Sequence, residues 1–268
     1  MLESFTIPYF CSMNFDILLQ SALGAASRAS EAILRVKSGG FDAWSKSDAS
    51  PVTEADLASN EVLVSELASH GIPILSEEEK EVPYATRKNW TTYWLLDPLD
   101  GTKEFVKGLP EFTVNIALIH QGEPILGVIA IPEQHKVYYA ANSQAFVADI
   151  EGEAVANPRG ISPSNAERKL IVAASRSHLS PATSELIDEM ASNYDEVEIV
   201  RAGSALKFCM IAEGTAHVYP RFTPCMEWDT AAAHAILRNV GLNICRMADG
   251  LPLEYNKESL LNPPFIAQ

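Results

Sequence analysis

The sequence predicts a mixed fold, α+β in its first part and α/β in its second. Short apolar runs separated by turn residues fill residues 112–149, which is typical of an antiparallel meander. After residue 169, strand-like and helix-like segments alternate, which indicates a layered α/β unit. A polar stretch with Gly and Pro, residues 151–168, lies between them. We therefore assign residues 1–155 to the first part and residues 156–268 to the second.

Two helices are expected before the sheet. Ala, Leu and Ile recur at helical spacing over residues 15–36, and Gly39-Gly40 follows. A second helix is expected to run from Thr53 to about His70. Thr53 is a good N-cap, and Asp56 falls at the third helical position of a capping box.

The strands follow in order. Residues 73–75 and 93–96 are short apolar strands, and each runs directly into acidic residues. The meander comprises four further apolar runs, at residues 112–119, 124–131, 137–141 and 145–149. In the second part the expected strands are residues 170–172, 197–200 and 216–219, and the expected helices are residues 181–192, 204–212 and 228–239.

The composition excludes some classes of function. With 47% hydrophobic and 21% charged residues, the 268-residue chain resembles an ordinary globular protein. Its formal net charge of −15 opposes binding of polymeric nucleic acid, which rewards basic surfaces. A small anionic substrate remains compatible with this charge, because bound cations and a few basic groups can hold it. No apolar run approaches the ~20 residues of a transmembrane helix.

Cysteine use and the first residues bear on location. The cysteines at positions 11, 209, 225 and 245 lack the paired spacing of a metal site, so they indicate free thiols in a reducing compartment. The first dozen residues lack the pattern of a secretion signal, and Met13 is an alternative start. We therefore expect a cytoplasmic protein, free or peripheral at the inner face of the cell membrane. The sequence specifies no oligomeric state.

The most informative segment is Asp97-Pro98-Leu99-Asp100-Gly101-Thr102. It follows the apolar run at residues 93–96, and its Pro and Gly predict a turn after that strand. Two aspartates on one bend offer the hard oxygen ligands that Mg²⁺ prefers. Gly101 lets the backbone approach a phosphate closely, and Thr102 can orient a water.

Carboxylates also stand where other elements begin or end, at Asp56, Glu77 and Asp229. Each has a simpler explanation: Asp56 as a helix cap, Glu77 as part of a solvated loop, and Asp229 as an acid in the first turn of a helix. The apolar flanks of Asp97 and Asp100 are harder to explain, because a charge near a core is costly unless it is paired or metal-bound. Two Mg²⁺ ions roughly 4 Å apart can drive an in-line displacement at phosphorus, and three or four carboxylates would offset their charge.

A second group of residues could bind another anionic group. Ser204 and Lys207 are three apart on an expected helix and so share a face, while Arg221 follows Pro220 at a strand end. The alternatives are a helix cap for Ser204, a surface charge for Lys207 and a surface ion pair for Arg221. His178 is better explained as a loop residue.

Several motifs together resemble one enzyme family. The paired signatures are residues 97–102 and Trp228-Asp229, and the segments 50–56 and Ser76-Glu77-Glu78 also fit. Four further segments indicate one branch of that family, at residues 101–105, 175–178, 203–209 and 219–222. In this order, from about Phe15 to Pro264, they resemble the lithium-sensitive inositol monophosphatase superfamily. Within it, they are similar to the 3'(2'),5'-bisphosphate nucleotidases of the bacterial sulfur-assimilation type.

The resemblance implies a five-layer αβαβα sandwich and a role for each matching position. It implies two or three Mg²⁺ ions held by Glu77, Asp97, Asp100, Asp229 and the carbonyl oxygen of Leu99. Thr102 and Asp56 would orient and deprotonate the attacking water, with help from Glu77. The scissile phosphate would contact Gly101, Thr102 and Lys103, and the rest of the nucleotide would contact Ser204, Lys207, Arg221 and Asp229. Arg176 and His178 are further candidates there.

The function expected from this resemblance is Mg²⁺-dependent hydrolysis of the 3'-phosphate of adenosine 3',5'-bisphosphate to AMP and phosphate. The partner is therefore a small-molecule nucleotide. Two alternatives stay open. One keeps the chemistry and acts on inositol phosphate or a sugar bisphosphate, and the other is a regulatory protein that binds metal or nucleotide without catalysis.

Overall fold

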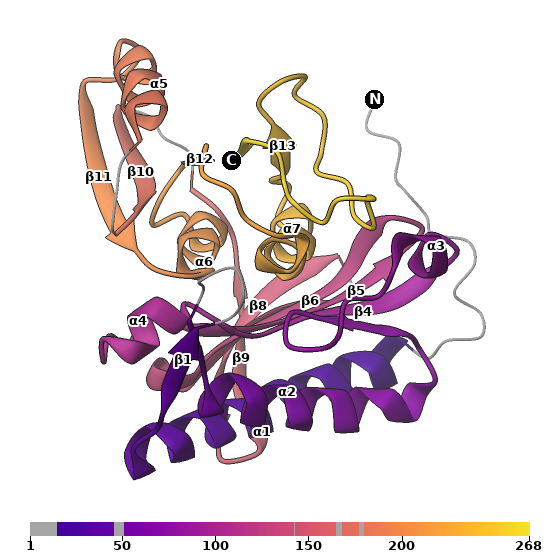
Figure 1. The fold of residues 1–268 in the computed structure, drawn as a ribbon. Coiled ribbons are helices and arrows are strands. Elements are labelled where there is room, and N and C mark those ends of the chain that lie inside the picture. Colours follow the sequence, from indigo (N-terminus) through magenta and orange to yellow (C-terminus); the bar gives the residue numbers. More distant parts are fainter. Residues whose placement is uncertain (1–14, 46–50, 142, 165–167, 177–179) are drawn as a thin grey trace.

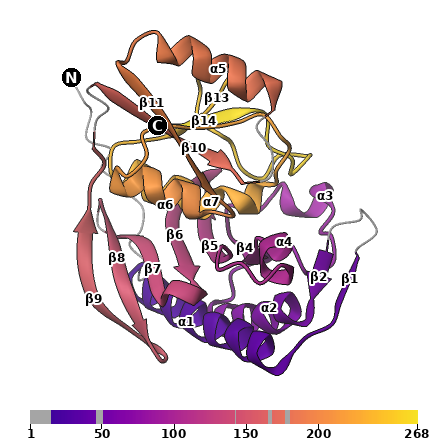
Figure 2. The same cartoon turned by 90° about the vertical axis from the view of Figure 1, so that its left-hand side faces the viewer.

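The computed structural model describes residues 15–45, 51–141, 143–164, 168–176 and 180–268. Cys11, Met13 and His178 lie outside these ranges. The elements form successive layers of helices and sheets, as Figures 1 and 2 show from two directions.

The first layer is a pair of helices, α1 (Phe15–Gly39) and α2 (Glu54–Leu67), which pack against each other on one face of the large sheet (Figure 1). Small residues such as Ala22, Ala26 and Ala29 are fully buried on α1 and permit this close packing. The hairpin of β1 (Ala43–Ser45) and β2 (Pro51–Thr53) leads into α2, and the 3₁₀ helix η1 (Ala68–His70) follows it.

The large sheet confirms the predicted meander. Its order is β3-β4-β5-β6-β7-β8-β9, antiparallel throughout except for the parallel pair β3 and β4. The strands are β3 (Ile74–Ser76), β4 (Thr92–Asp100), β5 (Thr113–His120), β6 (Glu123–Ile131), β7 (Lys136–Ala141), β8 (Gln144–Glu151) and β9 (Ala154–Ile161). Short helices α3 (Tyr84–Arg87), α4 (Thr102–Val106) and η2 (Pro132–Gln134) lie in the connections. β9 crosses the boundary expected between residues 155 and 156, so the sheet continues to Ile161.

Both faces of this sheet are covered, and the alternation of side chains along β4 assigns each residue to one face. Trp94 and Leu96 pack with the α1–α2 layer. Tyr93 and Leu95 pack in the opposite core, with the second half of the chain. The period of two therefore places Asp97 on the same face as Tyr93 and Leu95, toward the second half.

The remaining layers come from the second part of the chain. Helices α6 (Leu206–Glu213) and α7 (Ala231–Arg238) cover the inner face of the large sheet. Above them lies a second β layer in two portions. One is the parallel pair of β10 (Lys169–Ser175) and β11 (Glu196–Ala202), and the other has the order β12-β14-β13, with β12 (Tyr219–Arg221), β13 (Ile244–Arg246) and β14 (Phe265–Ala267). A bridge between Val172 and Val218 joins its two portions. On the outside, Ile187 of α5 (Pro181–Ala191) packs on Leu170 and Val172, which completes the αβαβα sandwich (Figure 1).

The segment from Asp97 to Asp100 differs from the turn that the sequence predicts. It is the irregular end of β4, where three steps from Asp97 to Asp100 oppose two steps from Asn115 to Thr113 on β5. Pro98 has no N–H to donate to the ladder, and a bulge is where a strand tolerates it. The bulge keeps both aspartates on a rigid strand rather than on a free loop.

The contact between β6 and α7 depends on Gly127. A Cβ atom there would lie 2.1 Å from the carbonyl oxygen of Ala232, so Gly127→Ala must push α7 away from the sheet. We expect this change to lower the free energy of unfolding by about 1–3 kcal/mol, as overpacked cores do. Gly160→Ala is the matched control, because its Cβ would meet nothing within 4 Å. Equal chemical denaturation midpoints for the two variants would contradict the close packing of α7.

Candidate active site

Three carboxylates from distant parts of the chain meet at one end of the large sheet. Glu77, Asp97 and Asp229 each offer one oxygen atom, and these atoms lie within 4.8 Å of one another. The parallel pairing of β3 and β4 accounts for two of them, since the N–H of Glu77 donates to the carbonyl oxygen of Leu96 over 3.2 Å. Asp229 ends the 3₁₀ helix η3 (Glu227–Asp229), just before α7. Such a set of oxygens suits a hard divalent cation.

Asp100 joins this acidic group from the other end of the β4 bulge, and its position is set by hydroxyl groups. The hydroxyl of Ser204 donates to its Oδ2 atom over 2.7 Å, and it lies 2.6 Å from the hydroxyl of Thr113. Ser204 has a φ of 50°, an uncommon conformation for a residue other than glycine. In this structure, therefore, Ser204 contacts an expected metal ligand rather than pointing away from the acidic group.

Asp56 and Thr102 are in contact, as the resemblance implies. The Oδ1 atom of Asp56 lies 3.0 Å from the Thr102 hydroxyl, and Oδ2 accepts from the N–H and the hydroxyl of Thr53 over 2.7 and 2.6 Å. One oxygen thus completes the predicted capping box, while the other faces Thr102. The Thr102 hydroxyl is also 3.2 Å from the carbonyl oxygen of Leu99. The cap and the site use the same carboxylate.

Gly101 is required by its surroundings. Its φ is 94°, and a Cβ would lie 2.8 Å from the carbonyl oxygen of Glu111 and 3.2 Å from the Cβ of Ser204. Any other residue would push apart the two segments that meet here. Lys103, two positions on, is exposed on α4.

The mutual repulsion of the acids is visible in their pKa values. Burial, and then the charges of Glu77, Asp100 and Asp229, raise the pKa of Asp97 well above its ordinary value. Burial and the charge of Asp100 raise the pKa of Asp229 to about 7, against the opposing effect of Arg221. Burial also raises the pKa of Asp56. Protons or cations are needed to relieve this repulsion, and a divalent cation fits the oxygen-only donor set.

The cationic candidates lie nearby but differ in exposure. The ammonium of Lys207 donates to the carbonyl oxygens of Ser204 and Ala202 over 2.6 and 3.2 Å, and the residue is only 3% exposed. Its contacts in this structure are therefore internal, and the predicted contact with a nucleotide stays a prediction. Arg221 is more accessible, and its guanidinium lies 4.0 Å from Asp229.

Sequence reasoning missed Glu111 and Thr113. Glu111 accepts from the N–H of Gly203 over 2.9 Å and forms a bidentate ion pair with Arg176. The ion pair with Arg176 lowers the pKa of Glu111. Thr113 links Ser204 to Asn115, since its hydroxyl also lies 3.0 Å from the Oδ1 atom of Asn115. The sequence did contain a signal for Glu111: it is an acidic residue beside the apolar run 112–119, just as Asp97 is beside the run 93–96.

The five layers and the acidic cluster define the class of protein. The model of the inositol monophosphatase family matches residues 16–266, and the chain belongs to this family. The family resemblance drawn from the motifs is thereby confirmed.

Within this family, the chain is similar to proteins named CysQ. The chain is 41% identical over 253 residues to the 3'(2'),5'-bisphosphate nucleotidase CysQ of Shigella flexneri, and 40% identical to that of Escherichia coli K12. Each match covers 92% of this chain and 98% of the relative. The solved structure of CysQ from Bacteroides thetaiotaomicron, a bacterial member of the same family, superposes with a TM-score of 0.85 at 41% identity, covering 95% of this chain and 98% of that one. Among the residues that the structure describes, no helix is long and apolar enough to cross a membrane.

The raised pKa values predict how Mg²⁺ and pH act on stability. Asp97 and Asp229 have higher pKa values folded than unfolded, so without metal the protein should lose stability as the pH rises from about 4 through about 7. Mg²⁺ binds the ionised acids, so it should raise the melting temperature more at pH 8 than at pH 6. Asp97→Asn should raise stability at pH 8 without metal by about 1 kcal/mol or more, and should remove most of the Mg²⁺ effect.

Thermal denaturation with and without Mg²⁺ measures both effects. Asp195→Asn is the control, since this exposed acid pairs with Arg168 and is not among the charges that raise the pKa of Asp97 or Asp229. An Mg²⁺-induced shift in Asp97→Asn equal to that of the unchanged protein would refute a metal site at Asp97.

Proposed function

We propose that this protein is a Mg²⁺-dependent phosphatase that hydrolyses the 3'-phosphate of adenosine 3',5'-bisphosphate to AMP and phosphate. The convergence of Glu77, Asp97 and Asp229 within 4.8 Å carries the phosphatase chemistry. The choice of substrate is supported by the 41% identity, over nearly the whole chain, to relatives named 3'(2'),5'-bisphosphate nucleotidase.

The residues that would hold two or three Mg²⁺ ions are Glu77, Asp97, Asp100, Asp229 and the carbonyl oxygen of Leu99. When bound there, Mg²⁺ would lower the pKa of a coordinated water and offset the negative charge on the phosphoryl group and the leaving oxygen. The protein's own contribution is the fixed placement of these oxygens. Asp97 is held on a bulged strand, Glu77 by its pairing beside β4, and Asp100 by the hydroxyl of Ser204.

Thr102 and Asp56 orient the attacking water and accept its proton. The Thr102 hydroxyl donates its hydrogen to Asp56, which leaves an oxygen lone pair free to accept from water. As the water attacks, its proton can pass to Thr102 while the proton of Thr102 passes to Asp56. Burial raises the pKa of Asp56 and makes it a better base, while the two bonds from Thr53 keep it oriented. Glu77 assists Thr102 and Asp56, as the family resemblance implies.

The substrate is held by two further groups. Gly101, Thr102 and Lys103 contact the scissile phosphate at the end of the bulge. Ser204, Lys207, Arg221 and Asp229 contact the rest of the nucleotide, with Arg221 the more exposed of the two cations. To contact the nucleotide, the Lys207 ammonium must exchange one of its bonds to the carbonyl oxygens of Ala202 and Ser204 for a bond to the substrate. We also propose a cytoplasmic location, consistent with the free thiols of Cys209, Cys225 and Cys245.

A phosphate-release assay on a panel of substrates tests the proposal. With Mg²⁺, adenosine 3',5'-bisphosphate should be hydrolysed with a higher kcat/KM than inositol 1-phosphate or fructose 1,6-bisphosphate. Asp100→Asn should reduce kcat by at least about 100-fold, because it removes a carboxylate ligand of the Mg²⁺ that would offset the negative charge of the transition state.

The panel separates the alternatives. A preference for inositol phosphate or the sugar bisphosphate would replace the proposed substrate but keep the chemistry. Nucleotide binding without phosphate release above the Asp100→Asn rate would instead favour a non-catalytic regulatory protein.

A further inference from the structure

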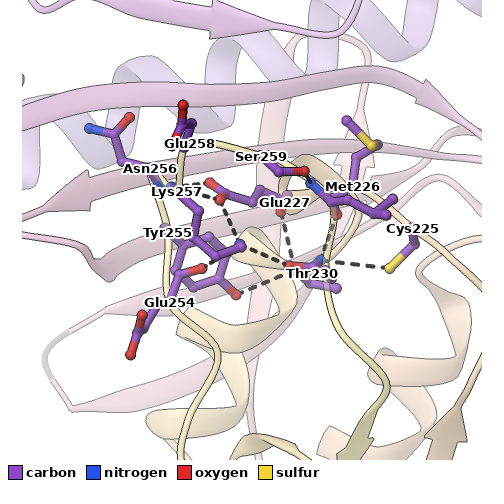
Figure 3. Close-up of polar contacts among 12 residues, drawn as sticks. Cys225, Met226, Glu227, Thr230, Glu254, Tyr255, Asn256, Lys257, Glu258 and Ser259 are labelled. Atoms are coloured by element: carbon purple, nitrogen blue, oxygen red, sulfur yellow. Dashed lines mark hydrogen bonds and ion pairs between the residues drawn. The ribbon is translucent and has the colours of Figure 1, made fainter. Parts of the chain in front are cut away.

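The loop that ends in Asp229 is fastened by a polar cluster that the proposed chemistry does not use. We define residues 254–262 as the C-terminal strap, and Figure 3 shows it against residues 225–230. Two backbone bonds pair the segments: the N–H of Glu227 donates to Leu260 over 2.9 Å, and that of Asn262 donates to Cys225 over 2.8 Å. The strap thus lies beside the loop like an added strand, with a bridge between Met226 and Leu261.

Glu227 is the centre of this cluster, and its side chain is 0% exposed. Its Oε1 atom accepts from the backbone N–H and the ammonium of Lys257 over 3.0 and 2.6 Å. Its Oε2 atom accepts from the N–H of Asn256 over 2.7 Å. All three donors belong to the strap (Figure 3). Because a buried carboxylate is costly without partners, Glu227 strongly favours the docked position of the strap.

Two other buried side chains secure the same arrangement. Asn262 donates from its amide to the carbonyl oxygen of Met226 over 2.8 Å and to the Thr230 hydroxyl over 3.0 Å. From the far side, Arg87 donates to the carbonyl oxygens of Lys257 and Glu258 over 2.6 and 2.8 Å. The strap is therefore held between α3 and the loop.

The fastened loop orients Asp229 directly. The N–H of Met226 donates to the Oδ2 atom of Asp229 over 3.1 Å, and the N–H of Asp229 donates to the carbonyl oxygen of Met226 over 3.2 Å. The carbonyl oxygen of Met226 thus accepts from both the Asp229 N–H and the Asn262 amide of the strap. Mutation of a group that orients a metal ligand typically costs about 10–100-fold in metal affinity or activity.

We infer that Glu227 is a positioning residue, which with the C-terminal strap holds the 225–229 loop so that the Asp229 carboxylate meets Glu77 and Asp97. This inference rests on the metal role proposed for Asp229. A merely structural Glu227 would affect stability alone. A positioning Glu227 also sets the Mg²⁺ concentration at which the enzyme works, with little effect on turnover once Mg²⁺ saturates.

The first test compares the Mg²⁺ dependence of phosphate release in Glu227→Gln and in the unchanged protein. Glutamine has the same shape, but it lacks the charge and turns an NH₂ group toward strap donors. We expect the half-saturating Mg²⁺ concentration to rise about 10–100-fold, with kcat at saturating Mg²⁺ little changed. Ile187→Ala is the control, since it opens a cavity in the outer core and should lower the melting temperature without altering Mg²⁺ dependence. An unchanged half-saturating Mg²⁺ concentration in folded Glu227→Gln would overturn the inference.

The second test needs neither metal nor activity, so it separates this inference from the proposed function. Hydrogen exchange of the peptide covering residues 225–229 should be faster in Glu227→Gln and Asn262→Ala than in the unchanged protein, and unaltered in Ile187→Ala. Exchange at the unchanged rate in both variants would show that the strap does not order the loop. Absence of any Mg²⁺ effect on the unchanged protein would refute the metal site alone. If Glu227→Gln does not fold, Asn262→Ala serves for both measurements.

Discussion

Repulsion among carboxylates is the constraint on which the rest of this structure depends. Asp97 is buried in the inner core beside Glu77 and Asp229, and its pKa is raised first by this burial and then by the neighbouring charges. Like charges in a medium of low dielectric constant separate unless the surrounding chain holds them or a cation offsets them. Three of the acids at this site are accordingly oriented by hydrogen bonds from neighbouring groups. Ser204 holds Asp100, the backbone of Met226 holds Asp229, and the cap of α2 holds Asp56.

The layered fold explains how distant segments supply these acids. The large sheet ends at the bulge of β4, and the helices of the middle layer bring Asp229 against that end. Gly127 lets α7 lie close to β6, and Gly101 lets the segment that begins at Gly203 approach the bulge. The C-terminal strap then fixes the loop before α7, because its backbone N–H groups donate to the Glu227 carboxylate. The geometry of the site consequently depends on the packing of the sandwich, because a shift of α7 would move Asp229.

Much of this could be predicted from local sequence patterns. The helix cap formed by Thr53 and Asp56 follows from its spacing, and the apolar runs of the meander match the strands β5 to β8 closely. β9 was missed because it is a largely exposed edge strand, so burial imposes no apolar pattern on it. The turn predicted after residue 96 was wrong, because β4 continues there as a bulge. The sequence cannot show that β4 and β5 pair again beyond Pro98. The meeting of Glu77 with Asp229 came from the family resemblance, because no local pattern encodes a contact between residues so far apart. The burial of Lys207 was missed for a related reason, as its partners are backbone carbonyl oxygens that any sequence would offer.

We propose that the acidic group formed by Glu77, Asp97 and Asp229 is a divalent cation site. Crystallography with Mn²⁺ in place of Mg²⁺ tests it most directly, because the anomalous signal of Mn²⁺ identifies the ion independently of activity. We expect an anomalous peak about 2 Å from oxygen atoms of all three side chains, with Asp100 or the Leu99 carbonyl oxygen as a further ligand. A crystal soaked in Mn²⁺ that shows no peak there, or a peak only at surface carboxylates such as Asp195, would contradict it.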